Sequence, residues 1–377
     1  MKTKTPHVLT LGAALLLAPL TSTLAQSTWE TVDAIMPYAG HAIVADSSGD
    51  FITLSISTNS TSPPVYTVVS VSSDTGLTWQ TVGTIPGNAL KLAATPDGTL
   101  FASGNSSGTV NGRGFIWYSI DRGATWIVSD PVPGNTNIIP QTGTFMAMDV
   151  AAGNAGTVYV GGFIYAGLTW VVRKGQLTAG GIAWSTVGSF PGIQLNSIFV
   201  RPGAAGQPDD ILVCGTAPNS QWTVRHTSNG GATWAIIDNY GSDGNPDSVA
   251  AGPDGSIYVL GGTLGTGWLV RKSSNGGATW ANVDFIAKGL PAYGCGITVD
   301  AFGRIFAVGS LNNTWLVRAS VDGGLTWGMT DPFAPAGYSS AAPSGVASDA
   351  LGNVCVIGTL ANGTPQSVAA VRRLAAK

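Results

Sequence analysis

A tryptophan recurs along the chain with the same surroundings each time. Between its copies the sequence alternates short apolar segments with turns rich in Gly and Asp, and it shows no helical periodicity. A period of about 50 residues made of short strands is typical of a β-propeller, in which each repeat is one four-stranded sheet. The copies therefore predict an all-β fold, a seven-bladed propeller of four-stranded antiparallel blades. They lie 46 to 58 residues apart, at Trp29, Trp79, Trp126, Trp184, Trp234, Trp280 and Trp327.

The last repeat lacks an outer strand of its own. The 50 residues after Trp327 amount to one further period, but they end without another Trp hairpin. The segment Thr-Trp-Glu-Thr-Val around Trp29 matches the outer-strand segment Thr-Trp-Gln-Thr-Val around Trp79. We therefore expect residues 27–32 to complete the seventh blade, which closes the ring and leaves no open sheet edge between the first and last blades. Residues 26–377 then form a single domain.

The first 25 residues have the features of a signal peptide. Two lysines precede an apolar run over residues 8–20, and Thr-Leu-Ala follows at 23–25. We expect cleavage after Ala25 and a mature protein that is secreted, periplasmic or displayed at the cell surface. Beyond residue 25 no run approaches the roughly 18 apolar residues of a spanning helix, so no membrane span is expected.

Composition excludes several kinds of partner. Charged residues make up 10% of the chain, where about 25% is usual, and the net charge is −3, so nucleic acid is not an expected partner. The three cysteines, Cys214, Cys295 and Cys355, are an odd number within apolar runs, which favours buried free thiols. No Cys/His cluster has zinc spacing and no Gly-rich loop ends in Gly-Lys-Ser/Thr, so neither a metal nor a cofactor is expected.

A second pattern immediately precedes the recurring tryptophan. Residues 72–79 read Ser-Ser-Asp-Thr-Gly-Leu-Thr-Trp, and four other copies keep the same spacing. This motif resembles the Asp-box, or bacterial neuraminidase repeat, of the sialidase-like β-propellers. The copy before Trp184 keeps only Gly181 and the tryptophan, and its hairpin is expected to be irregular. The box positions are Asp74 with Trp79, Asp121 with Trp126, Asn229 with Trp234, Asn275 with Trp280, and Asp322 with Trp327.

The resemblance implies both a fold and a possible chemistry. It implies that the boxes lie on hairpins between the third and fourth strands, remote from any active site, where short polar side chains bond turn amides. It also implies that a sialidase would need an Arg triad, a Tyr nucleophile with a Glu partner, and an Asp acid/base. The chain has one Glu, Glu30, beside the tryptophan of the closing strand. A glycosidase that uses two Asp carboxylates remains open.

Arginines and aspartates recur together on the outer strands. Three arginines stand nine residues before the box tryptophan, namely Arg225, Arg271 and Arg318, while aspartates stand four residues after it in five copies. We expect ion pairs across the third and fourth strands of one blade, such as Arg271 with Asp284, and Arg372 as the partner of Asp33. The alternative is an anion-binding ring of arginines.

The expected ligand site lies on the face with the loops that join the blades and the loops between second and third strands. Concave sites in propellers form there, at the mouth of the central channel. Aromatic rings on such loops can cover the apolar face of a sugar while short polar groups bond its hydroxyls. The candidate ligand-binding residues are Tyr38, His41, Arg113, Tyr240, Asp243, Asp247, Lys288, Tyr293 and Tyr338.

These observations favour a binding function over catalysis. We expect an exported, monomeric propeller that acts as a binding or scaffold module for a glycan or an extracellular protein, without catalytic residues, metal or cofactor. The alternative is a glycoside hydrolase of sialidase-like fold, either an exo-sialidase or a carboxylate-pair glycosidase. Two carboxylates converging at the mouth, or three arginines converging with a tyrosine, would favour the alternative.

Overall fold

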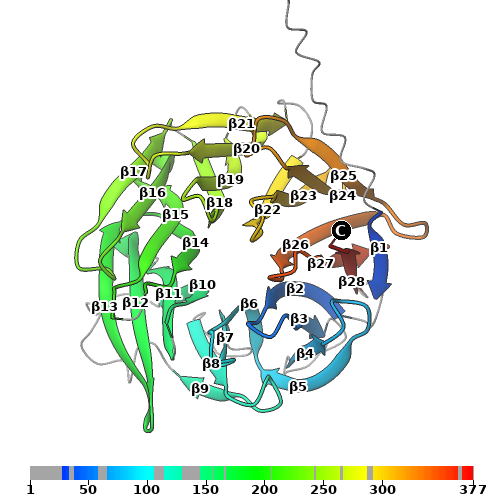
Figure 1. Cartoon of the computed structure of the whole chain (residues 1–377), viewed down its shortest axis with the longest axis horizontal. Helices are drawn as coiled ribbons and strands as arrows, with labels where there is room; N and C mark the ends of the chain where they lie inside the picture. The colour runs from blue at the N-terminus through cyan, green and yellow to red at the C-terminus, as the bar shows by residue number, and fades with distance from the viewer. Residues whose placement is uncertain are drawn as a thin grey trace, which may run out of the picture.

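The chain forms a ring of seven four-stranded antiparallel sheets (Figure 1), as the repeats predict. The computed structural model describes residues 28–33, 38–57, 66–105, 114–129, 145–154, 156–164, 167–204, 206–241, 243–263, 266–286, 292–363 and 367–376. Within these ranges there is no α-helix, and hence none that could span a membrane. The signal peptide predicted for residues 1–25 lies outside them.

Each blade is a meander that runs from the axis of the ring to its rim. Blade 1 comprises β2 (Tyr38–Ala45), β3 (Phe51–Ser57), β4 (Tyr66–Ser72) and β5 (Gln80–Pro86). Blade 2 comprises β6 (Asn88–Ala94), β7 (Leu100–Asn105), β8 (Gly114–Ser119) and β9 (Ile127–Ser129). Blade 3 comprises β10 (Phe145–Ala152), β11 (Thr157–Ile164), β12 (Thr169–Thr178) and β13 (Gly181–Pro191). Blades 4 and 5 comprise β14 (Gln194–Arg201), β15 (Asp210–Ala217), β16 (Gln221–Thr227) and β17 (Ala235–Tyr240), with a 3-10 turn at Pro218–Ser220; and β18 (Gly244–Ala251), β19 (Ile257–Thr263), β20 (Thr266–Ser273) and β21 (Ala281–Ile286). Blades 6 and 7 comprise β22 (Ala292–Val299), β23 (Ile305–Leu311), β24 (Thr314–Ser320) and β25 (Gly328–Phe333); and β26 (Ser340–Ser348), β27 (Val354–Ala361), β28 (Ser367–Leu374) and β1 (Glu30–Asp33).

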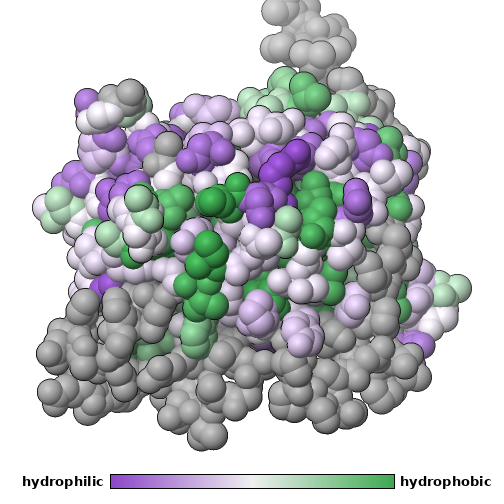
Figure 2. Space-filling view, turned by 90° about the horizontal axis from the view of Figure 1, so that it is seen from below, coloured by the Kyte–Doolittle hydropathy of each residue, from purple (hydrophilic) through white to green (hydrophobic). Residues whose placement is uncertain are grey.

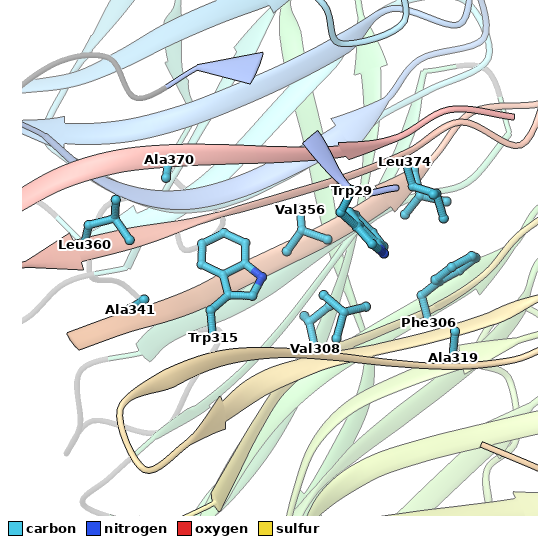
Figure 3. Packing of buried hydrophobic residues seen from close by; sticks show 12 residues of the cluster. Trp29, Phe306, Val308, Trp315, Ala319, Ala341, Val356, Leu360, Ala370 and Leu374 are labelled. Carbon is cyan, nitrogen blue, oxygen red and sulfur yellow. The ribbon is translucent and has the colours of Figure 1, made fainter. Parts of the chain in front are cut away.

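The N-terminal strand completes the seventh blade, which confirms the predicted closure. Strand β1 pairs antiparallel with β28, with Thr31 opposite Arg372. Trp29 enters the core between blades 6 and 7, where its ring meets Phe306 edge-on at 6.4 Å between centroids (Figure 3). The closing strand therefore contributes a large buried side chain as well as backbone hydrogen bonds.

Large tryptophans on third strands fill the space between blades 4 and 5 and the space between blades 5 and 6. Trp222 and Trp268 are fully buried, and each ring lies against a glycine on the second strand of the next blade. A Cβ atom on Gly261 would lie 2.9 Å from the Trp222 ring, and one on Gly309 would lie 2.6 Å from Trp268. Glycine at these positions lets neighbouring sheets approach closely enough to bury the indoles.

The box hairpins join third and fourth strands, and their polar groups bond within the turn. Asp74 Oδ1 accepts hydrogen bonds from the Thr78 amide and the Ser72 hydroxyl, both at 2.8 Å, and Asp74 Oδ2 accepts from the Thr78 hydroxyl at 2.6 Å. Gly76 has a φ of 90°, which side chains rarely adopt. The amide bond recurs at Asp121, Asn229, Asn275 and Asp322. These groups stabilise hairpins and leave little capacity for a ligand.

The divergent third copy forms a regular hairpin, so the expected irregularity was wrong. Strands β12 and β13 pair from Thr169 opposite Pro191 to Thr178 opposite Gly181. The register shifts once, between Val172 and Arg173. A tight two-residue turn at Ala179 and Gly180 replaces the box and extends both strands.

The ion pairs cross from blade to blade, not within one blade as predicted. Arg318 of blade 6 donates from Nε and Nη2 to the two carboxylate oxygens of Asp284 in blade 5, at 2.6 and 2.7 Å. Arg271 binds Asp238 of blade 4 in the same way. Arg372 contacts Asp331 of blade 6. The hairpin register separates the predicted within-blade partners, whereas stacking of adjacent sheets brings these groups together.

Candidate functional site

Every innermost strand has a β-bulge at the same place. In β2 the register shifts between Gly40 and Ala42, which leaves His41 unpaired, and the six other inner strands repeat the shift. A bulge re-aims a side chain and bends the strand. The unpaired residues, called the axial ring below, are His41, Leu90, Met148, Asn196, Asp247, Cys295 and Ser344.

Glycine opposite the bulge makes this geometry possible. In blades 2 to 7 the residue that pairs just before the bulge is a glycine of the second strand, as Gly261 pairs with Pro246. A Cβ atom on Gly261 would lie 2.2 Å from the Asn245 carbonyl oxygen. The axial ring is thus built into the repeat, and its chemistry varies from blade to blade.

One lysine acts electrostatically on titratable groups of several blades. Lys91 follows the bulge of β6, and its charge acts on His41 of blade 1, Asp149 of blade 3, Asp247 of blade 5 and Cys295 of blade 6. Blades that are not adjacent approach one another only where their inner strands surround the axis (Figure 1). We call these five residues the axial cluster.

Burial governs the protonation of the axial cluster. Burial, aided by the Lys91 charge, lowers the pKa of His41 to about 4, so this imidazole is neutral at pH 7. Burial raises the pKa of Asp247 to about 7, against the opposing effect of Lys91. Burial also raises the pKa of the Cys295 thiol to about 11, which makes it a poor nucleophile.

The two carboxyl groups of the cluster differ in what they can bind. Asp149 Oδ1 accepts the Val150 amide at 2.9 Å, and Oδ2 accepts the Ile198 amide of blade 4 at 3.0 Å. The Ser197 side chain adds a further bond to Asp149. Although burial raises its pKa, Asp149 is occupied as a link between blades 3 and 4.

Asp247 instead keeps one oxygen available. Its Oδ1 accepts the Asn245 amide nitrogen at 2.5 Å, while Asn245 Oδ1 accepts from Asn196 Nδ2 and Thr216 Oγ1, both at 2.9 Å. These two donors fix the orientation of the Asn245 amide, so its nitrogen must face Asp247. Asp247 Oδ2 accepts no hydrogen bond from any described residue. It is therefore a free acceptor within the cluster.

The remaining predicted site residues separate into three groups. Tyr293, on β22, is 64% exposed, and Asp243 is exposed just before β18. Tyr240 packs edge-on against Trp222 and lies 3.8 Å beneath the Arg271 guanidinium, so its role is structural. Two other tyrosines lie between blades, Tyr338 against the cluster of Trp29 and Tyr38 at a small cavity. Arg113 and Lys288 lie outside the described residues.

Sequence reasoning brought His41 and Asp247 into the site but missed four partners: Lys91, Asp149, Asn245 and Cys295. They lie on inner strands, not on connecting loops. Aligning the seven inner strands on their small residues would have revealed polar side chains at matching positions within Ala- and Gly-rich segments.

Solved structures show which fold this is. The chain aligns with the GH74 xyloglucanase of Xanthomonas campestris at 15% identity and a TM-score of 0.61, over 89% of this chain and 54% of that one. It aligns with the α-L-arabinanase of Penicillium chrysogenum at 14% identity and a TM-score of 0.51, over 92% of this chain and 97% of that one. It aligns with Sqt1 of Saccharomyces cerevisiae at 12% identity and a TM-score of 0.53, over 91% of this chain and 87% of that one.

The chain is a seven-bladed β-propeller. At these identities the likeness extends to the fold alone, and the chain spans about half the length of the xyloglucanase. No protein-family profile matches the chain, and no curated protein matches its sequence. The propeller's function must therefore be argued from its own residues.

We expect Asp247→Asn to remove a pH dependence of the propeller's stability. Because the folded-state pKa of Asp247 is raised to about 7, its contribution is full below the ordinary pKa and is lost as pH rises from about 4 to 7. The variant should be more stable than the parent by up to about 4 kcal/mol at pH 8 and nearly equal at pH 4. Denaturant unfolding at both pH values measures this.

The comparison between variant and parent isolates Asp247 from its neighbours. His41 acts in the opposite direction, because its lowered pKa reduces stability as pH falls through the range from 6.5 to 4. This effect is present in both proteins and cancels in the difference. Asp243→Asn, at an exposed position, serves as the matched control. Its free energy of unfolding should equal that of the parent at both pH values. A constant difference across the pH range would contradict the assignment.

Proposed function

We propose that this protein is an exported, non-catalytic propeller that binds a carbohydrate chain at the mouth of the ring, beside Asp247 and Tyr293. The observation that carries the proposal is the free Asp247 Oδ2 next to an oriented Asn245 amide. A carboxylate and an amide at fixed positions suit the paired hydroxyls of a sugar. The exposed ring of Tyr293 lies on the neighbouring inner strand β22, and it supplies an apolar face for the pyranose.

The geometry gives less support to hydrolysis. A carboxylate-pair glycosidase needs two available carboxyl groups, and the oxygens of Asp149 are already bonded to backbone amides. A sialidase would need a free Glu and three converging arginines. Glu30 forms an ion pair with Arg373 at 2.5 Å. Arg271 and Arg318 are likewise paired with aspartates, so binding without turnover is the function we propose.

Export and a monomeric state are parts of the same proposal. The order of charged, apolar and small residues over 1–25 supports export. Ile127, Val128 and Leu77 are among the exposed large apolar side chains. On the face that Figure 2 shows, apolar side chains are interspersed with hydrophilic ones. The apolar side chains do not form one continuous patch on that face.

A glycan array probed with the mature protein, followed by calorimetry on the best glycan, tests the proposal. We expect Asp247→Asn and Tyr293→Ala each to weaken binding about tenfold or more, which corresponds to about 1.4 kcal/mol. Asp243→Asn, exposed at the start of the same blade, should bind like the parent. Equal affinity in all three variants would contradict the assignment of the site.

The same preparation distinguishes binding from catalysis. We expect no turnover of a fluorogenic α-sialoside, xyloglucan or arabinan between pH 4 and 8. Turnover that Asp247→Asn or Asp149→Asn abolishes would replace the binding proposal with the hydrolase alternative. Binding of no glycan on a broad array would overturn the carbohydrate proposal altogether.

A further inference from the structure

The arginines that cross between blades occupy one position on the third strand, and this position is Ser70 in blade 1 and Trp117 in blade 2. Ser70 pairs with Thr81 in β4 and β5 as Arg271 pairs with Asn282 in β20 and β21. Ser70 therefore stands where blades 3 to 7 have arginine. On the facing blade, Asp33 pairs with Val371 in the backbone register in which Asp238, Asp284 and Asp331 pair with Val224, Val270 and Val317.

A cavity of about 40 Å³ lies at this junction between blades 1 and 7. Blade 1 lines it with the hydroxyls of Ser55, Ser70 and Thr81 and with Trp79, while blade 7 contributes Ala369 and Val371. Ala369 stands where blades 3 to 6 have a buried tryptophan, because it pairs with Thr359 as Trp315 pairs with Ser310. Two large side chains are thus replaced by small ones on opposite walls, which accounts for the space.

Two of the groups that line the cavity correspond to neighbours of a guanidinium group elsewhere in the ring. The Arg271 guanidinium lies 5.8 Å from the Trp280 ring, and its Nη1 donates to Asn282 Oδ1 at 2.6 Å. Trp79 and Thr81 hold the corresponding positions in blade 1 and both line the cavity. A volume of 40 Å³ holds about three water molecules, which is close to the four heavy atoms of guanidinium.

We propose that this cavity is a binding site for a guanidinium cation, either a small free one or the side chain of an arginine. The ligand would replace the arginine that blade 1 lacks, with the hydroxyls as acceptors and the Trp79 ring as a cation–π partner. The site is separate from the proposed glycan site, and its test does not depend on a glycan.

Thermal unfolding in 1 to 50 mM guanidinium chloride, with sodium chloride at equal ionic strength as the reference, tests the proposal. At about ten times Kd we expect a saturable rise in Tm of roughly 1 to 3 °C. Ser70→Arg should raise Tm by itself and abolish the response, since the added guanidinium fills the site. Arg318→Ser removes the guanidinium that binds Asp284, so added guanidinium should restore part of the lost Tm.

The outcomes separate clearly. A parent protein whose Tm does not rise, with Arg318→Ser rescued in the same plates, overturns the proposal. A Ser70→Arg variant that responds like the parent also overturns it. If the blocked peptide Gly-Arg-Gly raises Tm at lower concentration than guanidinium, the ligand is an arginine side chain. The opposite order assigns the site to a small free cation.

Discussion

A chain that begins at Ala34 is expected to unfold roughly 5 to 10 °C below the mature protein. Without β1, the strand β28 becomes an open edge, and Arg372 loses its bonds to Thr31 and to the Trp29 carbonyl. The larger loss is the Trp29 ring, which is 9% exposed in the core that Figure 3 shows. Removing a buried tryptophan side chain alone typically costs about 3–5 kcal/mol.

Differential scanning calorimetry on the shortened chain, Trp29→Ala and the mature protein measures the two contributions. Trp29→Ala keeps the backbone pairing of β1, so its Tm should lie between the other two. Glu30→Gln is the matched control, because the Glu30 side chain is half exposed and the amide oxygen of a glutamine can still accept the hydrogen bond of Arg373. A shortened chain that unfolds within about a degree of the mature protein would show that closure does not stabilise the ring.

Breaking one ion pair between blades should destabilise the propeller nearly as much as removing the Trp29 side chain. Asp284→Ala leaves the Arg318 guanidinium, whose side chain is 18% exposed, without its bidentate partner. It also removes the acceptor of the Trp268 indole, which donates to Asp284 at 3.0 Å. Removing one member of a buried pair typically destabilises a protein by about 3–5 kcal/mol, since the other charge stays buried.

Denaturant unfolding of the single and double variants tests that explanation. Replacing both partners, as Asp284→Leu with Arg318→Met, should recover much of the loss because no charge remains buried. The box residue Asp322 offers a contrast, since Asp322→Ala removes local turn bonds only. If the double variant is as unstable as the two singles combined, the pair does not act as a unit.

The parts of the fold that depend on neighbours in sequence could be predicted from it. The number of blades could be predicted from the Trp period. The five hairpins that carry the box could be predicted from the box, because the Asp74 bonds reach no further than Ser72 and Thr78. Closure was predictable because the Trp29 segment copies the Trp79 segment. The partner of Arg271 was not predictable in this way, since Asp238 reaches it by the stacking of two sheets and not by the register of one hairpin.

The candidate site was harder to predict than the fold. A bulge shifts the alternation of a strand by one residue, so simple alternation misassigns the side chains that follow, such as Lys91 and Asp149. No turn signal marks these bulges. The glycine opposite each bulge is a signal, but its meaning follows only from the approach of Gly261 to the Asn245 carbonyl in space.

Closure by the first strand also fixes the order of events when the protein is made. Thr31 and Arg372 are 341 residues apart, so blade 7 cannot form until nearly the whole chain has been synthesised. At about 5 to 20 residues per second, the ribosome leaves β1 without its partner for roughly 20 to 70 seconds. Throughout that interval the nascent ring has an unpaired strand at its start, and the Trp29 side chain has no core to enter.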